Sequence, residues 1–245
     1  MTTRYIRSWV GLAADLAAWL PIAALASAPA PAPAPAWTPA SLRAALAELP
    51  PGDTQRGRRV HEELFCASCH GGQGQAPTFN WPHTASQRAT YTAKMLLDYQ
   101  RGLRRENRGA QLMHDVAVAM TPQQIADVAA YYASLPAPHD AVTPRPGAAS
   151  AEAEQAALRL VTKGDPARLI TPCASCHGVK GQGGKWEAPA LAGQNPLYFV
   201  RTMLDYHGGQ RTNDAAKGMR VFAQRLTATE IDALARYYAD LPRQR

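Results

Sequence analysis

The sequence predicts an all-α protein built from two tandem domains, and three observations support this prediction. The first is an internal repeat, because a shift of 107 residues superposes Cys66 on Cys173 and keeps other residue types in register. The matched positions are Pro82, Ala85, Gln87, Tyr91, Leu97, Asp98, Tyr99 and Gly102 with Pro189, Ala192, Gln194, Tyr198, Leu204, Asp205, Tyr206 and Gly209. The second is a pair of capping boxes, at Thr121 and Thr227, each followed by apolar residues at helical spacing. The third is that no stretch of the sequence has the alternation typical of a strand.

The repeat also predicts the domain boundaries within the 245 residues. We expect domain 1 at residues 51–140, a linker at 141–150 and domain 2 at 151–245. Pro136 and Pro242 should end the closing helices of the two domains. Each domain then contains a helix leading into a cysteine motif, a glycine-rich turn, a middle helix, a ligand loop and the closing helix.

The N-terminal region predicts an export signal and a spacer. Basic residues precede an apolar run, so we interpret residues 1–26 as a secretory signal peptide that is cleaved after Ala26. The alternative is an uncleaved membrane anchor, which Asp15 inside the run disfavours by about 2.5–3.5 kcal/mol. Residues 27–50 begin with alternating Pro and Ala and end in a helical pattern over 41–49, which predicts a tether followed by a short helix. Under either interpretation the two domains lie outside the cytoplasm.

The four cysteines all belong to a five-residue motif, Cys-Ala-Ser-Cys-His, that occurs once in each domain. This spacing is the attachment signal of a c-type haem, since two thiols on one helical turn reach the two porphyrin vinyl groups and form thioethers. The His that follows lies under the ring, where its imidazole can bind the iron. We therefore predict two covalently bound haem c groups. The predicted thioether residues are Cys66, Cys69, Cys173 and Cys176, and the predicted proximal ligands are His70 and His177.

Two other uses of a cysteine pair fit this sequence less well. A zinc site of the ribbon type usually places its second pair within about twenty residues of the first, and here the separation is far longer. A thioredoxin-like dithiol requires a βαβ setting, which neither copy has. Haem also has an apolar face that an Ala-rich domain of this size needs for its core. We therefore expect each half to fold poorly without its cofactor.

Methionine is the expected second axial ligand, because a thioether raises the reduction potential of a haem relative to a nitrogen ligand. After the middle helix the repeat continues with a shift of 106, under which Met113 falls on Met219. No other pair of the six methionines coincides, so we predict these two as ligands. The expected core methionines are Met95, Met120 and Met203. For the first haem, Met120 and His114 remain alternatives to Met113, and His114 would lower its potential.

Each proximal His also needs an acceptor for its other ring nitrogen, which orients the imidazole and sets its basicity. Pro82 and Pro189 occupy matched positions and have free carbonyl groups, so we predict them as these acceptors. The alternative is that both prolines serve only as turn residues.

These motifs together resemble the dihaem cytochrome c4 family. The resemblance extends over about residues 52–242 and is closest in two segments, residues 189–194 and 209–214. It implies two class I cytochrome c domains related by a pseudo-twofold axis. It also implies that the haem propionates face one another across the interface between the domains.

The same resemblance implies an electron carrier that passes electrons to a terminal oxidase in the periplasm. The implied axial pairs are His70 with Met113 and His177 with Met219. The first domain has His83 where the second has Ala190. The first haem pocket is therefore expected to be the more polar of the two.

Charge and chemistry together favour a one-electron carrier without catalytic residues. The formal net charge is +7 at pH 7, but it forms no concentrated stripe of the kind that binds nucleic acid. The basic excess is larger in domain 2 than in domain 1, which suggests a different redox partner for each, an electron donor and an acceptor. One alternative is a cytochrome subunit of a larger dehydrogenase or oxidase complex. Another is a dihaem peroxidase or thiosulfate oxidoreductase, which needs an open iron position or a spare Cys ligand.

Overall fold

The computed structural model describes residues 35–137, 150–184 and 188–241. All of these belong to one compact unit, Pro33–Arg245. The predicted signal peptide and nearly all of the predicted linker lie outside the described residues, so the domain boundaries stay a prediction. Within the described ranges no helix is long and apolar enough to cross a lipid bilayer.

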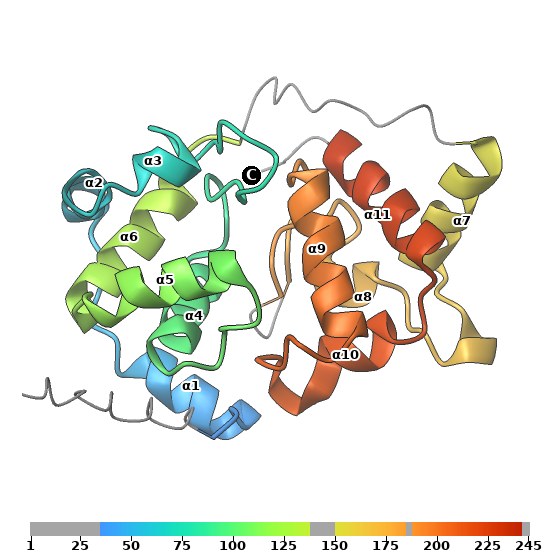
Figure 1. Cartoon of the computed structure of the whole chain (residues 1–245), viewed down its shortest axis with the longest axis horizontal. Helices are drawn as coiled ribbons and strands as arrows, with labels where there is room; N and C mark the ends of the chain where they lie inside the picture. The colour runs from blue at the N-terminus through green and yellow to red at the C-terminus, as the bar shows by residue number, and fades with distance from the viewer. Residues whose placement is uncertain (1–34, 138–149, 185–187, 242–245) are drawn as a thin grey trace, which may run out of the picture. The chain divides into compact units, whose positions relative to one another are not determined.

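The regular structure is helical in both halves of the chain, as predicted (Figure 1). Below, the first half means residues 51–137 and the second half means residues 150–241. The helices up to residue 137 are α1 (Pro39–Ala47), α2 (Thr54–Glu63), α3 (Ala67–His70), α4 (Ala89–Gln100), α5 (Arg108–Val118) and α6 (Pro122–Ser134). The second half contains α7 (Ala151–Thr162), η1 (Pro166–Arg168), α8 (Ala174–His177), α9 (Pro196–His207), η2 (Ala215–Lys217), α10 (Gly218–Ala223) and α11 (Ala228–Asp240). Among the described residues no strand forms, and the only β-type pairing is a single bridge between Asp165 and Ile170.

Each half has its own apolar core, formed by matched helices. In the first half α6 packs against α2 and α4, and in the second half α11 packs against α7 and α9. The residues predicted for the inner face of each closing helix are all buried: Ile125, Val128, Ala129 and Tyr132, and Ile231, Leu234, Ala235 and Tyr238. The predicted core methionines Met95, Met120 and Met203 are buried as well. The repeat in the sequence is therefore also a repeat in packing.

Both predicted capping boxes are present at the start of the closing helices. The Thr121 hydroxyl accepts the backbone N–H of Gln124 at 3.2 Å, and the Gln124 side chain accepts the backbone N–H of Thr121 at 2.9 Å. Thr227 and Glu230 make the same exchange at 3.2 and 2.8 Å. The first closing helix ends at Ser134, two residues before Pro136, while Pro242 lies outside the described residues.

The segments predicted as ligand loops are helical instead, which corrects that prediction. Met113 lies on α5, whose N-terminus is capped by the Asn107 side chain accepting the Ala110 N–H at 2.9 Å. Met219 lies on the short α10, which follows a turn with left-handed backbone at Ala216 and Lys217. Both methionines are therefore held on helical backbone, and their positions depend on how these helices pack.

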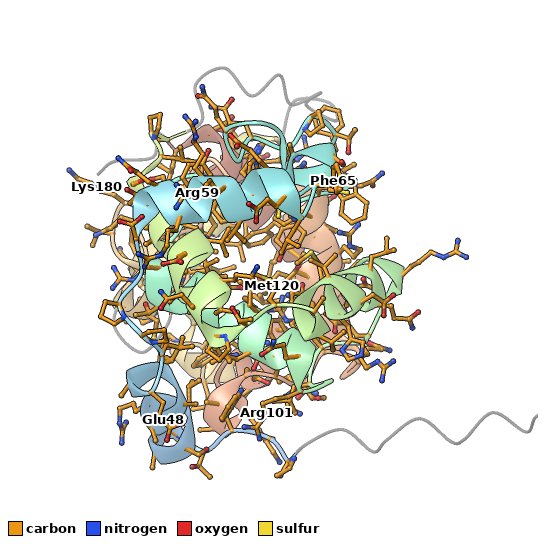
Figure 2. The ribbon with its side chains drawn as sticks, turned by 90° about the vertical axis from the view of Figure 1, so that its left-hand side faces the viewer. Glu48, Arg59, Phe65, Arg101, Met120 and Lys180 are labelled. Atoms are coloured by element: carbon orange, nitrogen blue, oxygen red, sulfur yellow. The ribbon has the colours of Figure 1, made fainter. Side chains whose placement is uncertain are left out.

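The short N-terminal helix begins and ends two residues before the predicted range, because Thr38 and Ser41 form a capping box with Pro39 in the first turn. Asp53 caps the start of α2, with its side chain accepting the Arg56 N–H at 2.8 Å. Figure 2 shows Arg59 on the outward side of α2, whereas Met120 lies among the helices of the first half.

Candidate haem-binding site

The two cysteine motifs each form a single helical turn, α3 and α8. In both copies the His backbone N–H donates to the carbonyl of the first cysteine, at 2.9 Å for His70 and 3.0 Å for His177. This turn places the two thiols and the imidazole of each motif on one short element. Both His rings are buried, and their burial lowers the pKa of each, so the neutral imidazole that binds iron is favoured.

A glycine ends each of these turns, and its backbone adopts a positive φ that other residues rarely adopt. Gly71 has φ 72° and Gly178 has φ 82°, the left-handed region that other residues rarely adopt. A Cβ added at Gly71 would lie 1.9 Å from the carbonyl oxygen of Gln75, so the chain could not make its close return with a larger residue. These glycines therefore let the backbone leave the motif sharply and curve back beside it.

The first thiol of each motif does not have the lowered pKa of a metal-bound or catalytic cysteine. Burial raises the pKa of the Cys66 thiol, and it raises the pKa of Cys173 to about 11, whereas reactive cysteines have depressed values. No cluster of three or more His, Cys, Asp or Glu side chains in the described ranges could hold a metal ion. Neither the zinc nor the dithiol alternative gains support from this geometry.

A carbonyl group faces the Nδ1 atom of each motif histidine. His70 Nδ1 lies 3.1 Å from the Pro82 carbonyl oxygen, and His177 Nδ1 lies 3.0 Å from that of Pro189. Since a carbonyl only accepts, Nδ1 carries the proton and Nε2 is left with the lone pair that an iron ligand requires. Both predicted prolines thus present their carbonyl oxygens to the Nδ1 atoms of the motif histidines.

A cavity of about 860 Å³ is lined by both motifs. Met113 and Met219 both line it, as do the two His side chains, and apolar groups make up most of its wall. His114 does not line the cavity, since its Nδ1 contacts the backbone carbonyl of Tyr99. Met120 lines the cavity and is also a buried core residue. The structure thus brings the repeat-matched methionines to the same cavity as the histidines and leaves His114 outside it.

Two matched arginines are buried in the wall of this cavity, and the sequence reasoning did not select them. Arg104 and Arg211 are 3% and 2% exposed, and both line the cavity. Arg104 is paired with Glu106 at 2.7 Å, whereas Nη1 of Arg211 has no hydrogen-bond partner among the described side chains and backbone. A buried cation with an unpaired N–H is stabilised by a hydrogen-bond acceptor, and most strongly by an anion. The shift of 107 residues superposes these arginines, so the repeat could have identified them.

These features fit haem. An apolar cavity suits the porphyrin face, the two thiols of each motif suit thioether attachment, and the buried guanidinium groups suit the carboxylates of the propionates. His83, which distinguishes the first pocket, is 4% exposed, and its Nδ1 accepts the backbone N–H of Ala76 at 3.0 Å. His61 is buried in the core, with its Nδ1 atom 2.9 Å from the Tyr132 hydroxyl.

Comparison with known families matches each half separately. The family model described as "Cytochrome c" matches residues 54–136, and "Cytochrome C oxidase, cbb3-type, subunit III" matches residues 169–237. Among curated relatives, cytochrome c4 of Thiocapsa roseopersicina is 33% identical over 192 residues, 78% of this chain and 93% of the relative. The thiosulfate dehydrogenase electron acceptor of Stutzerimonas stutzeri is 32% identical over 179 residues, 73% of this chain and 79% of the relative.

Solved structures give the same result for the fold. The reduced recombinant cytochrome c4 from Pseudomonas stutzeri matches with a TM-score of 0.67 and 28% identity, covering 78% of this chain and all of that one. A thiosulfate dehydrogenase from Marichromatium purpuratum matches with a TM-score of 0.67 and 30% identity, covering 77% of this chain and 40% of that one. The relatives and the repeated motif show two covalently attached haem c groups and an electron-transfer protein. This chain belongs to the dihaem cytochrome c4 family.

Proposed function

We propose that this chain is a periplasmic electron carrier that shuttles single electrons through two His/Met-ligated haems towards a terminal oxidase or a similar acceptor. In this proposal the vinyl groups are bound by Cys66, Cys69, Cys173 and Cys176. The axial ligands are His70 and Met113 in the first half and His177 and Met219 in the second. The haem iron, when bound, supplies the one-electron chemistry.

The observation that carries the proposal is the repeated hydrogen bond of the proximal histidines. Each Nδ1–H donates to a proline carbonyl at 3.0–3.1 Å, which orients the imidazole and leaves Nε2 as the free base. The wall of the cavity next to these imidazoles is mostly apolar. A methionine from a separate helix lines the same cavity in each half, so a sulfur atom would be available there as the second ligand. A saturated iron exchanges electrons without binding substrate.

Optical spectroscopy tests the ligand assignment directly. The oxidised protein should show the far-red band of sulfur-to-iron charge transfer from both haems, and the reduced protein should not bind carbon monoxide rapidly. Prompt carbon monoxide binding at either haem would contradict the proposal and favour a dihaem enzyme. Haem content of two per chain, measured by pyridine haemochrome assay, is the control for complete loading.

A second candidate function is electron acceptor for a thiosulfate dehydrogenase. It is favoured by two relatives of that description, 32% identical over 179 and 183 residues, and by the structural match to a thiosulfate dehydrogenase. Stopped-flow reduction by a purified thiosulfate dehydrogenase with thiosulfate, compared with oxidation by a purified haem-copper oxidase, would separate the two functions. Fast reduction of this protein by the dehydrogenase would support the second candidate function. Slow reduction by the dehydrogenase, together with fast oxidation by the oxidase, would support the first function, a carrier in a respiratory chain.

Charge should affect these encounters mainly through association rate. The predicted domain 2 carries the larger basic excess, so the two partners are proposed to dock on different halves. The association rate with at least one partner should therefore fall as ionic strength rises. Rates that are independent of salt for both partners would contradict separate charge-guided docking.

A further inference from the structure

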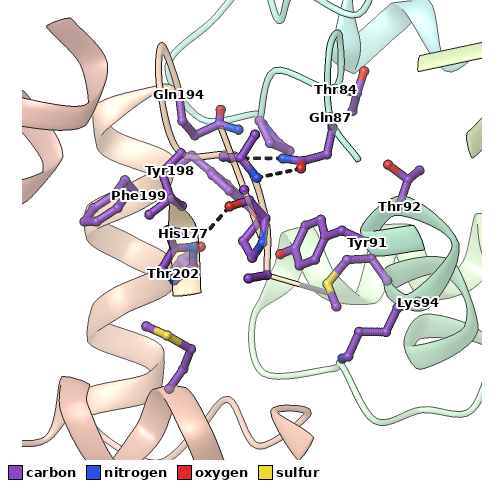
Figure 3. Close-up of a pocket in the computed structure, with 18 of the residues that line it drawn as sticks. Thr84, Gln87, Tyr91, Thr92, Lys94, His177, Gln194, Tyr198, Phe199 and Thr202 are labelled. Atoms are coloured by element: carbon purple, nitrogen blue, oxygen red, sulfur yellow. Dashed lines mark hydrogen bonds between the residues drawn. The ribbon is translucent and has the colours of Figure 1, made fainter. Parts of the chain in front are cut away.

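Two glutamines at matched positions each bind the backbone of the opposite half. Gln87 donates through Nε2 to the Ala190 carbonyl at 3.1 Å and accepts the Ala190 N–H through Oε1 at 2.9 Å (Figure 3). Gln194 makes the same two bonds to His83, also at 3.1 and 2.9 Å. Because the shift of 107 residues relates Gln87 to Gln194 and His83 to Ala190, the contacts are reciprocal, as a twofold relation between the halves requires.

The peptide group that each glutamine contacts also serves the opposite proximal histidine. The N–H of Ala190 and the carbonyl of Pro189 belong to one peptide group, and that carbonyl faces His177 Nδ1 at 3.0 Å (Figure 3). In the first half the N–H of His83 and the carbonyl of Pro82 likewise share a peptide group that faces His70. Each imidazole is thus linked through a single peptide unit to an amide of the other half.

Both glutamine amides are held in a defined orientation. Each is buried, and each Oε1 also accepts the backbone N–H of the next residue, Arg88 or Asn195, at 2.9 Å. The oxygen therefore faces two donors and the NH₂ group faces a carbonyl, so the reversed amide would be unfavourable. The preceding residues, Ser86 and Gly193, have positive φ and donate to the carbonyls of Tyr132 and Tyr238 at 2.8 and 2.7 Å.

We propose that Gln87 is a positioning residue for the second haem and Gln194 for the first, so that each half sets the proximal ligand of the other. This inference rests on the proposed function, in which His70 and His177 bind iron. Hydrogen bonds in a chain polarise one another, so an acceptor on the peptide N–H makes the proline carbonyl a stronger acceptor. The imidazole then becomes more electron-rich and stabilises the ferric state. Each glutamine therefore lowers the reduction potential of the haem attached to the opposite half.

The test is a redox titration of Gln87→Leu and Gln194→Leu in the full haem-loaded chain. Met113→His and Met219→His, which lower the potential of one haem each, identify which midpoint belongs to which half. Gln87→Leu should raise the midpoint of the second haem more than that of the first, and Gln194→Leu should do the reverse. The Nδ1–H proton resonance of the opposite histidine, observed in the ¹⁵N-labelled reduced protein, should move upfield as its hydrogen bond weakens.

If the glutamine variants only loosened the contact between the two halves, the shifts of the two haem midpoints would not follow the crossed pattern described above. Asn195→Ala, which removes the bonds from Asn195 Nδ2 to the Thr78 and Trp81 carbonyls at 2.9 and 3.2 Å, is the control for a lost contact between the halves that removes no charge and touches neither peptide group. The inference would be overturned by any of three results in the redox titration of the glutamine variants. These are equal shifts of both haem midpoints, a shift only of the haem in the variant's own half, or no shift of either midpoint. If the Leu variants do not fold, Gln87→Asn and Gln194→Asn replace them, since the shorter side chain withdraws the amide. A wild-type spectrum without low-spin His/Met haem would instead refute the proposed function itself.

Discussion

The guanidinium group of Arg211 lies over the ring of Tyr206, with its carbon 4.4 Å from the ring centroid. Arg104 lies over Tyr99 in the same way, at 4.8 Å, so both halves hold a buried cation against a matched tyrosine. Each arginine also acts on a tyrosine of the other half, since Arg211 donates to the Tyr91 hydroxyl at 3.5 Å and the charge of Arg104 acts to lower the pKa of Tyr198. The cavity wall thus carries positive charge at the contact between the two halves.

Replacement of Arg211 by Met should lower the reduction potential of at least one haem. A buried positive charge next to the cofactor disfavours the ferric state, and its removal also leaves a propionate without its counter-ion. Potentiometric titration measures the shift, and Arg211→Lys, which retains the charge, should shift the midpoint less. Arg56→Met removes a cation that does not line the cavity and serves as the control. A higher potential in Arg211→Met would contradict this account.

Replacement of Met219 or Met113 by Ala should open one coordination position. We expect the far-red charge-transfer band to lose about half of its intensity in each variant, because each iron supplies one such sulfur bond. The reduced variant should bind one carbon monoxide per chain. Met120→Ala and His114→Ala are matched controls and should leave the spectrum unchanged. If His114→Ala or Met120→Ala opened the first haem, the assignment of Met113 would be wrong.

Removal of one haem should unfold its half. The core of the first half surrounds an apolar cavity, and Cys66→Ala with Cys69→Ala would leave that cavity wall exposed to water. Far-UV circular dichroism of this double variant should show loss of helix and a broad, non-cooperative melt. The matched pair Cys173→Ala with Cys176→Ala should do the same to the second half. A cooperative melt near that of the wild type would refute the cofactor's role in folding.

Asp127→Asn should destabilise the first half in a pH-dependent way. The carboxylate accepts from the backbone N–H of Asp53 at 2.7 Å and from Arg56 at 2.8 Å. Burial acts to raise the pKa of Asp127, but these hydrogen bonds outweigh it and the pKa lies below its ordinary value of 3.8. The group therefore stabilises the fold above that value, and this contribution is lost as the pH falls through the folded-state pKa.

The expected cost of Asp127→Asn at pH 7 is about 1–3 kcal/mol of unfolding free energy. Denaturant unfolding at a series of pH values measures it, and the difference from wild type should shrink in strong acid. Arg58, whose pair with Glu62 is exposed, provides the comparison, since Arg58→Ala should change stability by less than about 1 kcal/mol. An Asp127→Asn deficit that stayed constant with pH would exclude the carboxylate charge as its cause.

Trp37 attaches the N-terminal segment to the first half and should contribute to stability. Its Nε1–H donates to Asp98, which is fully buried and also accepts from Lys94 and from Asn213 of the second half. The guanidinium of Arg101 lies 3.7 Å from the Trp37 ring centroid. Trp37→Phe should cost about 1–2 kcal/mol, since it removes one hydrogen bond to a buried carboxylate. Thermal unfolding measures this, and an unchanged melting temperature would show that the segment adds no stability.

Much of the fold could be predicted because its signals are local. The capping boxes at Thr121 and Thr227 are read from residues three positions apart, and both are confirmed. The prediction that the segments containing Met113 and Met219 form loops was wrong, because both are helical. Turn and helix signals compete in these short stretches, and in the first of them the Asn107 side chain caps a helix.

The sequence by itself located the two Cys-Ala-Ser-Cys-His motifs at which we predict haem attachment, because the porphyrin dictates the spacing of the thiols on one helical turn. It also determined the duplication, which fixed matched positions such as Pro82 and Pro189. Only the tertiary structure decided that Gln87 reaches Ala190 and that Arg104 and Arg211 share one cavity wall. These contacts join residues that are about a hundred positions apart, and they depend on how the two halves pack rather than on any local pattern.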